Sequence, residues 1–285
     1  MGSQQLKPQE ERWVIIVLIG VQIAHIVDAM LIMPLGPQFM RIWGITPTEF
    51  GLLVSCYAGS ACISALICAF LMNRYDRRSA LIFLYLGFIT SIVFCISATD
   101  YTALLLARSL SGVFGGVLNA IVYSIIADLI PEERRGYALG KVGVAFPLSS
   151  VAWVPIGLAL ANLYGWHTPY ICLLIISVLI GLGIVKFIPP LKDHVKNINS
   201  YSAAEEIRTI LKETNHRRSL ALISVLSLGG FSVVPFISPY MVNNVGLTEV
   251  QLPLIYLFGG LAAIFTSRVI GRLCDTNGKV KIFTI

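Results

Sequence analysis

The chain has 285 residues, of which 56% are hydrophobic and only 13% are charged, and its formal net charge is +6. Soluble domains carry roughly a quarter charged residues, so this composition and a mean hydropathy of +0.80 indicate a membrane protein and exclude an ordinary soluble domain. The lysines and arginines are spread over five loops with no single patch, which excludes nucleic acid as the expected partner.

Eight apolar segments are long enough to cross a bilayer, which takes about 20 residues of helix. Because only helices and closed barrels satisfy every backbone group in lipid, and these segments are uninterrupted, we predict an all-α membrane protein. The expected spans cover residues 13–36, 49–72, 80–98, 102–127, 139–161, 168–188, 219–241 and 250–272, and a ninth begins at 282–285.

Basic residues fall in alternate loops between these spans. They precede the first span and follow the second, fourth, sixth and eighth, whereas the other loops offer only Arg41. Short cytoplasmic loops carry an excess of lysine and arginine, so we expect a multi-pass protein with a cytoplasmic N-terminus. The first segment is too long for a signal peptide and carries Asp28 and prolines.

Among the ionisable residues inside the spans, two stand out; such residues cost about 2.5 to 3.5 kcal/mol each on insertion scales and are usually functional. Asp28 in the first span and Arg108 in the fourth lie at a similar depth, roughly 10 Å below the outer surface. His25 lies one turn from Asp28 on the same face, and Asn119 returns to nearly the same side as Arg108. We predict that Asp28 exchanges a proton and that Arg108 helps to hold an anionic or hydroxylated substrate.

A purely structural interpretation stays open for each of these residues. Arg108 would then donate hydrogen bonds to neighbouring backbone, and Asp28 would neutralise its charge without any part in transport. His25 would be a hydrogen-bonding residue that lines the pore. The glycines that follow Arg108 are typical of close helix packing; they are Gly112, Gly115 and Gly116.

The longest polar stretch runs from about residue 189 to 218. Pro189 and Pro190 end the sixth span, and Ser202 with Glu205 forms a capping box that opens a short amphipathic helix. We interpret the stretch as a cytoplasmic linker. The chain then divides into a six-helix bundle at 1–190, the linker at 191–217, and an incomplete second bundle at 218–285 with helices 7, 8 and the start of 9.

The second bundle repeats part of the first. A shift of 202 residues brings GRLCDTNGKV (271–280) over AFLMNRYDRR (69–78), with Asp275 over Asn73. The same shift, without a gap, also aligns a proline, a glycine and a threonine of the two halves. An internal repeat of this length indicates a duplicated unit.

The sequence offers no catalytic or metal-binding motif. The six cysteines lie in or at the ends of spans and form no CxxC pair, so neither a zinc site nor a disulfide framework is expected. The patterns HExxH, GxSxG and GxxxxGKS/T are absent. We therefore expect no enzymatic activity, no metal and no cofactor.

The loop after the second span resembles the G-x-x-x-D-R-x-G-R-R signature of the major facilitator superfamily, and GRLCDTNGK after the eighth span is similar to its second-half copy. Three further segments resemble bacterial drug and sugar efflux permeases of the twelve-helix proton-antiporter branch. They are RSLSGVFGG (108–116), ADLIPEERRGYALG (127–140) and YGWHTPY (164–170). The resemblance implies a secondary transporter that rocks two halves around a central cavity.

The resemblance also implies that the two repeated loops are cytoplasmic latches between the halves. By pseudo-symmetry we expect Asp275 near the start of helix 5, at 136–141, and helix 8 beside helix 5. Asn73, Arg74 and Arg77 should lack a partner and face solvent or one another. The implied latch residues are Asn73, Arg74, Asp76, Arg77, Arg78, Gly271, Asp275, Gly278 and Lys279.

The fifth helix departs from the antiporter pattern of the family. It keeps Pro147, which together with Gly112 and Gly116 would serve helix packing, but it places Phe146 where the family has a glycine. The first latch loop also has Asn73 where the family has aspartate. The direction of transport therefore stays open.

The function that the resemblance implies is proton-coupled efflux of a small organic solute, such as a drug, sugar or metabolite, by a monomer in the bacterial cytoplasmic (inner) membrane. Its partners would be the solute, protons and the lipid bilayer. Proton-coupled uptake is one alternative, and a membrane-embedded binding or regulatory protein without transport is another. A complete second repeat would run to roughly residue 390, so we expect a C-terminally truncated chain: a fragment, an interrupted reading frame or a natural short product.

Overall fold

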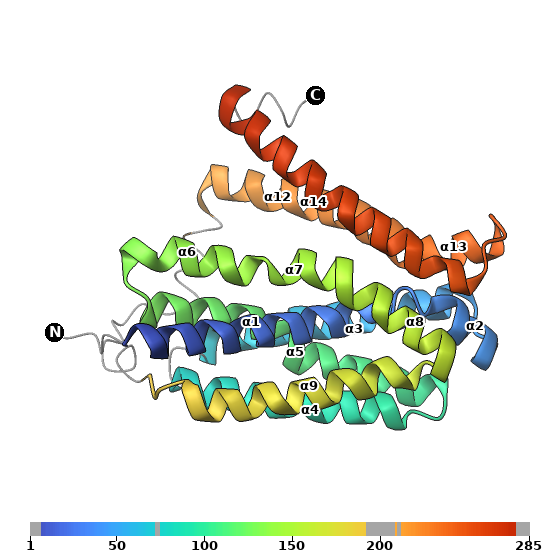
Figure 1. The fold of residues 1–285 in the computed structure, drawn as a ribbon, viewed down its shortest axis with the longest axis horizontal. Coiled ribbons are helices and arrows are strands. Elements are labelled where there is room, and N and C mark those ends of the chain that lie inside the picture. The colour runs from blue at the N-terminus through green and yellow to red at the C-terminus, as the bar shows by residue number, and fades with distance from the viewer. Residues whose placement is uncertain (1–6, 72–74, 192–208, 210–211, 278–285) are drawn as a thin grey trace.

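The computed structural model describes residues 7–71, 75–191, 209 and 212–277, and the regular elements within these ranges are helices (Figure 1). Eight segments of the described chain are long and apolar enough to cross a membrane, which confirms the predicted all-α membrane fold. The start of a ninth span at 282–285 lies outside the described residues. The eight segments are Gln9–Leu31, Pro47–Ala69, Arg77–Ser97, Tyr101–Leu129, Glu132–Tyr164, His167–Phe187, Thr214–Asn243 and Glu249–Thr266.

The first six spans pack into one bundle. In it α5 lies against α3 and α4, and α9 lies against α1, α4 and α8. Aliphatic side chains fill the interior, where a cluster of buried residues from α1, α4 and α5 includes Leu18, Leu84 and Ile121. The long helices are α1 (Pro8–Leu31), α3 (Pro47–Leu71), α4 (Arg77–Ser97), α5 (Tyr101–Leu129), α8 (Val154–Tyr164) and α9 (His167–Phe187).

Carboxylates start two of these helices. Asp76 precedes α4 and accepts hydrogen bonds from the backbone N–H and the hydroxyl of Ser79, at 3.0 and 2.8 Å. Asp100 precedes α5 and accepts from the backbone N–H of Ala103 at 2.9 Å. A carboxylate in this position satisfies a free N–H group and also interacts favourably with the positive end of the helix dipole.

The predicted end of the first span at residue 36 is wrong, because α1 ends at Leu31. Pro34 disfavours the helical conformation at the residue before it, and the chain turns over residues 32–35. A short helix, α2, then spans Gly36–Trp43. Gly44 caps its C-terminal end with a φ of 62°, a left-handed conformation that suits glycine.

The fifth span is interrupted in its middle. It consists of α6 (Glu132–Gly143), α7 (Ala145–Leu148), the π-helical segment η2 (Ser149–Trp153) and α8. Pro147 has no N–H group and cannot continue the helical hydrogen-bond ladder at that point. In η2 the N–H of Val154 donates to the carbonyl oxygen of Ser149, five residues back. Pro147 therefore marks a break in the helix, while its predicted packing role stays a prediction.

A second group of helices lies on the first bundle. It consists of α12 (Thr214–Val233), η3 (Val234–Phe236), α13 (Ile237–Asn243), η4 (Glu249–Gln251) and α14 (Leu252–Asn277). α14 packs against α7, η2 and α8, so the prediction that helix 8 lies beside helix 5 is confirmed. The predicted linker helix, with Ser202 and Glu205, lies outside the described residues.

The two ends of the molecule differ, and we name them for what they carry. The α2 end holds α2, α8 and α13, and there the second group contacts the first through α2, α3 and α8. The basic end holds the start of α1 and of α6, together with Arg77, Arg78, Arg134 and Arg135. Figure 1 shows α14 close to α8 at the α2 end and diverging from α6 toward the basic end.

The outer faces of the helices are apolar and suit contact with lipid. Large hydrophobic side chains are exposed there on α3, α4 and α9, and they include Leu66, Ile67, Phe83, Leu86, Leu179 and Leu182. In a soluble protein such a surface would lead to aggregation. Because a bilayer solvates these side chains, the same surface is stable in a multi-pass membrane protein.

Candidate functional site

Asp28 and Arg108 form an ion pair in the interior of the first bundle, toward its α2 end. A terminal nitrogen of Arg108 (Nη1) donates to Asp28 Oδ2 at 3.0 Å and to the backbone carbonyl oxygen of Asp28 at 3.1 Å. Both residues are completely buried. Sequence reasoning placed the two at a similar depth on different spans, and the structure brings them into contact.

The buried pair is not fully satisfied by hydrogen bonds. Two atoms of the pair, Asp28 Oδ1 and Arg108 Nε, have no hydrogen-bond partner among the described residues. The same holds for the hydroxyl of the nearby Tyr170. A buried charge without its full set of partners is costly. Ionisable residues inside membrane spans are expensive, which makes this pair a candidate functional site.

The ring of Tyr57 on α3 lies against the guanidinium group of Arg108. The Cζ atom of Arg108 lies 4.6 Å from the centre of the Tyr57 ring, which is the geometry of a cation–π interaction. Cys95 on α4 and Tyr170 on α9 are also close enough to interact electrostatically with Arg108 and Asp28. Helices α1, α3, α4, α5 and α9 therefore all contribute to the surroundings of the pair.

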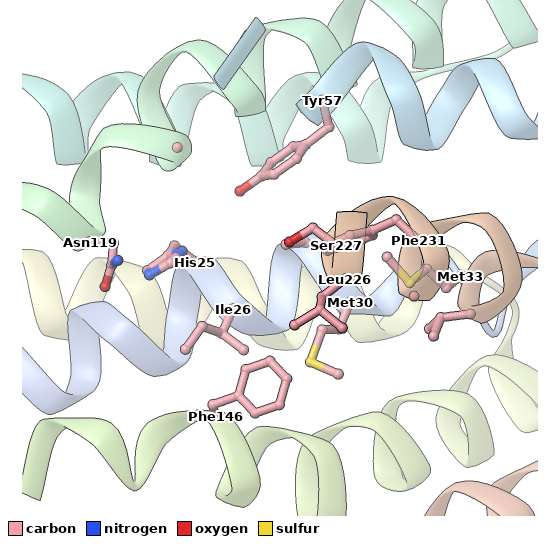
Figure 2. A pocket seen from close by; sticks show the side chains of 14 residues that line it. His25, Ile26, Met30, Met33, Tyr57, Asn119, Phe146, Leu226, Ser227 and Phe231 are labelled. Atoms are coloured by element: carbon pink, nitrogen blue, oxygen red, sulfur yellow. The ribbon is translucent and has the colours of Figure 1, made fainter. Parts of the chain in front are cut away.

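A cavity of about 620 Å³ lies between the two groups of helices. Figure 2 shows its lining, to which α1, α3, α5, α7, α12 and η3 contribute. Its polar side chains are His25, Tyr57, Asn119 and Ser227, and the rest of the lining is apolar. The apolar lining residues are Ile26, Ala29, Met30, Met33, Gly116, Phe146, Leu226, Gly230, Phe231 and Val234.

Hydrogen bonds to a third residue, Gln22, link His25 and Asn119 in this lining. Gln22 donates from Nε2 to Asn119 Oδ1 at 2.6 Å, and its Oε1 lies 2.7 Å from His25 Nε2. Gln22 is buried, whereas His25 and Asn119 reach the cavity. The amide therefore fixes the two cavity-facing side chains relative to each other and joins α1 to α5.

The glycines of α5 allow α3 to approach closely. A Cβ atom on Gly112 would lie closer than 3.0 Å to Ser60 and to the backbone of Tyr57, and one on Gly116 would clash with Ala61. Gly112 and Gly116 thus have the packing position that their spacing in the sequence indicates.

The expectation that Arg77 faces solvent or its own loop is wrong. Arg77 is buried, and its Nε lies 3.3 Å from Asp128 Oδ2 at the end of α5. Asp76 accepts from the backbone N–H of Leu191, and Arg78 donates to the carbonyl oxygen of Val185 at 2.6 Å. The loop has partners inside the first bundle because antiparallel neighbours α4 and α5 bring position 77 beside position 128. Asn73 and Arg74 lie outside the described residues.

The second predicted latch is only partly described. Asp275 and Gly271 lie within α14, but their side chains are outside the described part, as are Gly278 and Lys279 altogether. In this conformation the end of α14 diverges from α6 (Figure 1). The start of α6 instead contacts α1, where Arg134 forms an ion pair of 3.0 Å with Glu11. A contact between Asp275 and the start of helix 5 stays a prediction.

A polar cluster joins the two groups of helices at the α2 end. Gln38 Nε2 donates to Asn162 Oδ1 at 2.7 Å, and Asn162 Nδ2 donates to the backbone carbonyl oxygen of Glu249 at 2.9 Å. Glu249 also forms an ion pair with Arg41. Next to the cluster, the rings of Phe50 and Phe236 meet edge to face at 6.2 Å.

Sequence reasoning missed Gln22, Tyr57 and this α2-end cluster. Gln22 offered a signal, since it is a polar residue in a span, one turn before His25. Tyr57 offered none, because a tyrosine in an apolar helix is common. Within the described part of the chain, no three His, Cys, Asp or Glu side chains come together in a group that would hold a metal ion.

Curated relatives share this sequence over about half of their own length. The chain is 26% identical over 244 residues to the "Uncharacterized MFS-type transporter YtbD" of Bacillus subtilis (strain 168), which covers 84% of this chain and 59% of that protein. It is 24% identical over 225 residues to a "Probable sugar efflux transporter" of Pasteurella multocida (strain Pm70), with 79% of this chain and 54% of that protein covered.

Solved structures share the fold. A bacterial homolog of the human lysosomal transporter Spinster, in an inward-facing and unoccupied conformation, matches with a TM-score of 0.75 at 16% identity, over 95% of this chain and 64% of that one. The family model described as Major Facilitator Superfamily matches residues 18–285. The chain therefore belongs to the Major Facilitator Superfamily, a family of membrane transporters.

Proposed function

We propose that this protein exports a small organic solute across the bacterial cytoplasmic membrane in exchange for protons, by alternating access, with Asp28 as the group that binds and releases the proton. The observation that carries the proposal is the buried ion pair of Asp28 and Arg108 beside the 620 Å³ cavity between the two groups of helices. The name of the Pasteurella multocida relative, a probable sugar efflux transporter, supports export as the direction.

The pair has the properties that proton exchange requires. Asp28 Oδ1 is buried and has no hydrogen-bond partner among the described residues, so it is available to take a proton. While Asp28 is ionised, its charge holds Arg108. Held in this position, Arg108 attracts an anionic or hydroxylated group of the solute with its remaining N–H groups. Protonation of Asp28 then breaks the pair and releases the solute, so the proton and the solute occupy the site in turn, as exchange requires.

The orientation of the protein follows from its charges. We assign the basic end, with Arg77, Arg78, Arg134 and Arg135, to the cytoplasm, because cytoplasmic loops carry an excess of such residues. The contacts between the groups at the α2 end then close the outer side. On this assignment we interpret the conformation as the inward-facing state of the cycle.

The remaining roles complete the cycle. Residues 1–190 and 218–285 belong to two rocking units, joined by a linker at 191–217, and His25 and Asn119 face the solute. Asp275 and its neighbours form a latch when the cytoplasmic ends close. We also assign a monomer without enzymatic activity, as the resemblance to the family implies.

Transport by reconstituted protein tests the proposal. The complete product of the gene is placed in proteoliposomes with an imposed pH gradient, and fluxes of a panel of sugars and hydrophobic dyes are measured. Asp28→Asn should abolish gradient-driven flux while the protein still inserts in the membrane. The matched control is Asp100→Asn, which changes a surface carboxylate to an amide that still caps α5. Undiminished pH dependence in Asp28→Asn would exclude Asp28 as the proton site.

A further inference from the structure

We propose that Tyr57 is the gate between the solute cavity and the Asp28–Arg108 pair, so that a solute bound against its ring controls whether Asp28 exchanges a proton with the cavity. This inference rests on the proposed function, because it assigns the coupling step to one residue. Tyr57 thus acts as a positioning residue for Arg108 and not as a proton donor itself.

The first observation is that Tyr57 belongs to the cavity and to the charged site at once. Its side chain is part of the cavity lining, and the centre of its ring is 4.6 Å from Arg108 Cζ. Asp28 and Arg108, by contrast, are completely buried and are not part of that lining. Figure 2 shows the ring of Tyr57 extending from α3 toward the space between His25 and Ser227.

The second observation is that the surface of α5 leaves room for the ring. Tyr57 lies over the glycines of α5: its backbone packs on Gly112, and a Cβ atom on Gly115 would lie 3.2 Å from its hydroxyl oxygen. The backbone of Tyr57 is therefore fixed by close packing. The hydroxyl end of the side chain, by contrast, lies over Gly115, which has no side chain to hold the ring in place.

These contacts define a closed and an open position of the gate. In the closed position seen here, the ring contributes a cation–π contact to a desolvated guanidinium group and shields the pair from the cavity. A solute that displaces the ring removes this contact and lets water reach the pair. Asp28 then releases to that water the proton that it took up at the outer side, and the ionised carboxylate holds Arg108 for the solute.

Several other groups face Asp28 and share its electrostatic environment. Arg108 on α5 is its ion-pair partner, and Tyr57 on α3, Cys95 on α4 and Tyr170 on α9 interact with it electrostatically. His25 lies one turn away on α1 itself, within the cavity lining. Of these, Tyr57 combines contact with the pair and exposure to the cavity, so its substitution changes access without changing the charge of the site.

Chemical labelling of Asp28 tests the gate without any knowledge of the solute. A hydrophobic carbodiimide reacts with a protonated carboxyl group that it can reach, and mass spectrometry of the peptide that contains Asp28 measures the rate. Tyr57→Leu, which removes the ring face, should raise this rate about tenfold. That factor corresponds to about 1.4 kcal/mol, within the range of a desolvated cation–π contact. Tyr57→Phe, which keeps the ring, should react like the unmodified protein.

Two controls make the labelling specific. Phe146→Leu removes another aromatic ring from the cavity lining and should leave the rate unchanged. Asp28→Asn should remove the label from the peptide. If Tyr57→Leu does not fold, as judged by size-exclusion chromatography, Tyr57→Met serves as the second ring-free variant.

Proton flux measured with a pH-sensitive dye inside proteoliposomes completes the test. We expect proteoliposomes with either ring-free variant to show proton flux in the absence of solute. With Tyr57→Phe, proton flux should still require the solute. A folded ring-free variant with the unmodified labelling rate and no proton leak overturns the gate, even if Asp28→Asn abolishes gradient-driven transport. Unchanged transport in Asp28→Asn overturns the proposed function instead, whatever the labelling shows.

Discussion

Arg41 and Glu249 are 208 positions apart in the sequence, yet their side chains form an ion pair that joins the two groups of helices at the α2 end. Glu249 belongs to η4, whose backbone also accepts a hydrogen bond from Asn162 on α8. The same short segment is thus held from two sides. In the proposed inward-facing state, this contact is part of what keeps the outer side closed.

Breaking this pair should shift the protein toward the outward-open state by a modest amount. The side chain of Arg41 is 65% exposed and that of Glu249 18% exposed, so the pair contributes at most about 1 kcal/mol, or about a fivefold change in the equilibrium. In a background without the native cysteines, Ser238→Cys places a thiol at a buried site of α13. Arg41→Ala should increase maleimide labelling of that thiol from outside. The swapped pair Arg41→Glu with Glu249→Arg should restore protection, and no restoration would show that the charges do not interact.

Neutralising both members of the buried pair should cost less stability than neutralising one. Removing one partner leaves an uncompensated buried charge, which typically costs about 3–5 kcal/mol. Asp28→Asn and Arg108→Gln should therefore each lower the melting temperature in detergent more than the double variant does. Additive losses in the double variant would mean that the two residues contribute independently to stability.

Adding a methyl group at Gly116 should destabilise the bundle, whereas adding one at Gly140 should not. A Cβ atom at Gly116 would clash with Ala61 on α3, but nothing lies within 4 Å of the same atom at Gly140 on α6. Overpacking of this kind typically costs about 1–3 kcal/mol, while glycine to alanine in a helix without a clash gains about 0.5–1 kcal/mol. Thermal unfolding of Gly116→Ala and Gly140→Ala measures the difference. Equal stability would show that α3 and α5 separate easily.

Reversing the charge of Asp275 should weaken the state in which the cytoplasmic ends are closed. The repeat places Asp275 over the first latch loop, and α14 already packs beside the fifth span. Such an exposed contact at a helix start contributes about 0.3–1 kcal/mol. In the complete gene product, Asp275→Lys should increase labelling of cysteines placed at the cytoplasmic ends of the helices. Unchanged labelling would exclude the latch role.

The spans could be predicted because the bilayer imposes their length and apolar character on the sequence directly. The depth of Asp28 and Arg108 in the membrane was also predictable, because the rise per residue of a helix places both at one level. The interruption of the fifth span was less clear. Pro147 was assigned only a packing role, and the π-helical turn of η2 depends on the neighbouring helices and leaves no pattern of its own.

Contacts that depend on how a helix is rotated were not predictable. Tyr57 reaches Arg108 because the glycines of α5 let α3 approach, and the spacing of a single tyrosine does not reveal this. Arg77 was assigned wrongly because its partner was sought in the other half of the protein. Asp128 lies at the same end of the neighbouring antiparallel helix, and that proximity follows from connectivity once α4 and α5 are known to pair.

The π-helical turn of η2 sets the angular phase of the fifth span. One residue more than an α-helix requires is accommodated there, which rotates everything beyond it by about 100° relative to an uninterrupted helix. As a result Phe146, before the turn, points into the cavity, while Val151, within it, meets Gly260 of α14. A single-residue deletion between 149 and 153 would convert the π-helical turn to a regular α-helix and remove one of these two contacts. The fifth span can therefore line the cavity and pack on α14 only with its present number of residues.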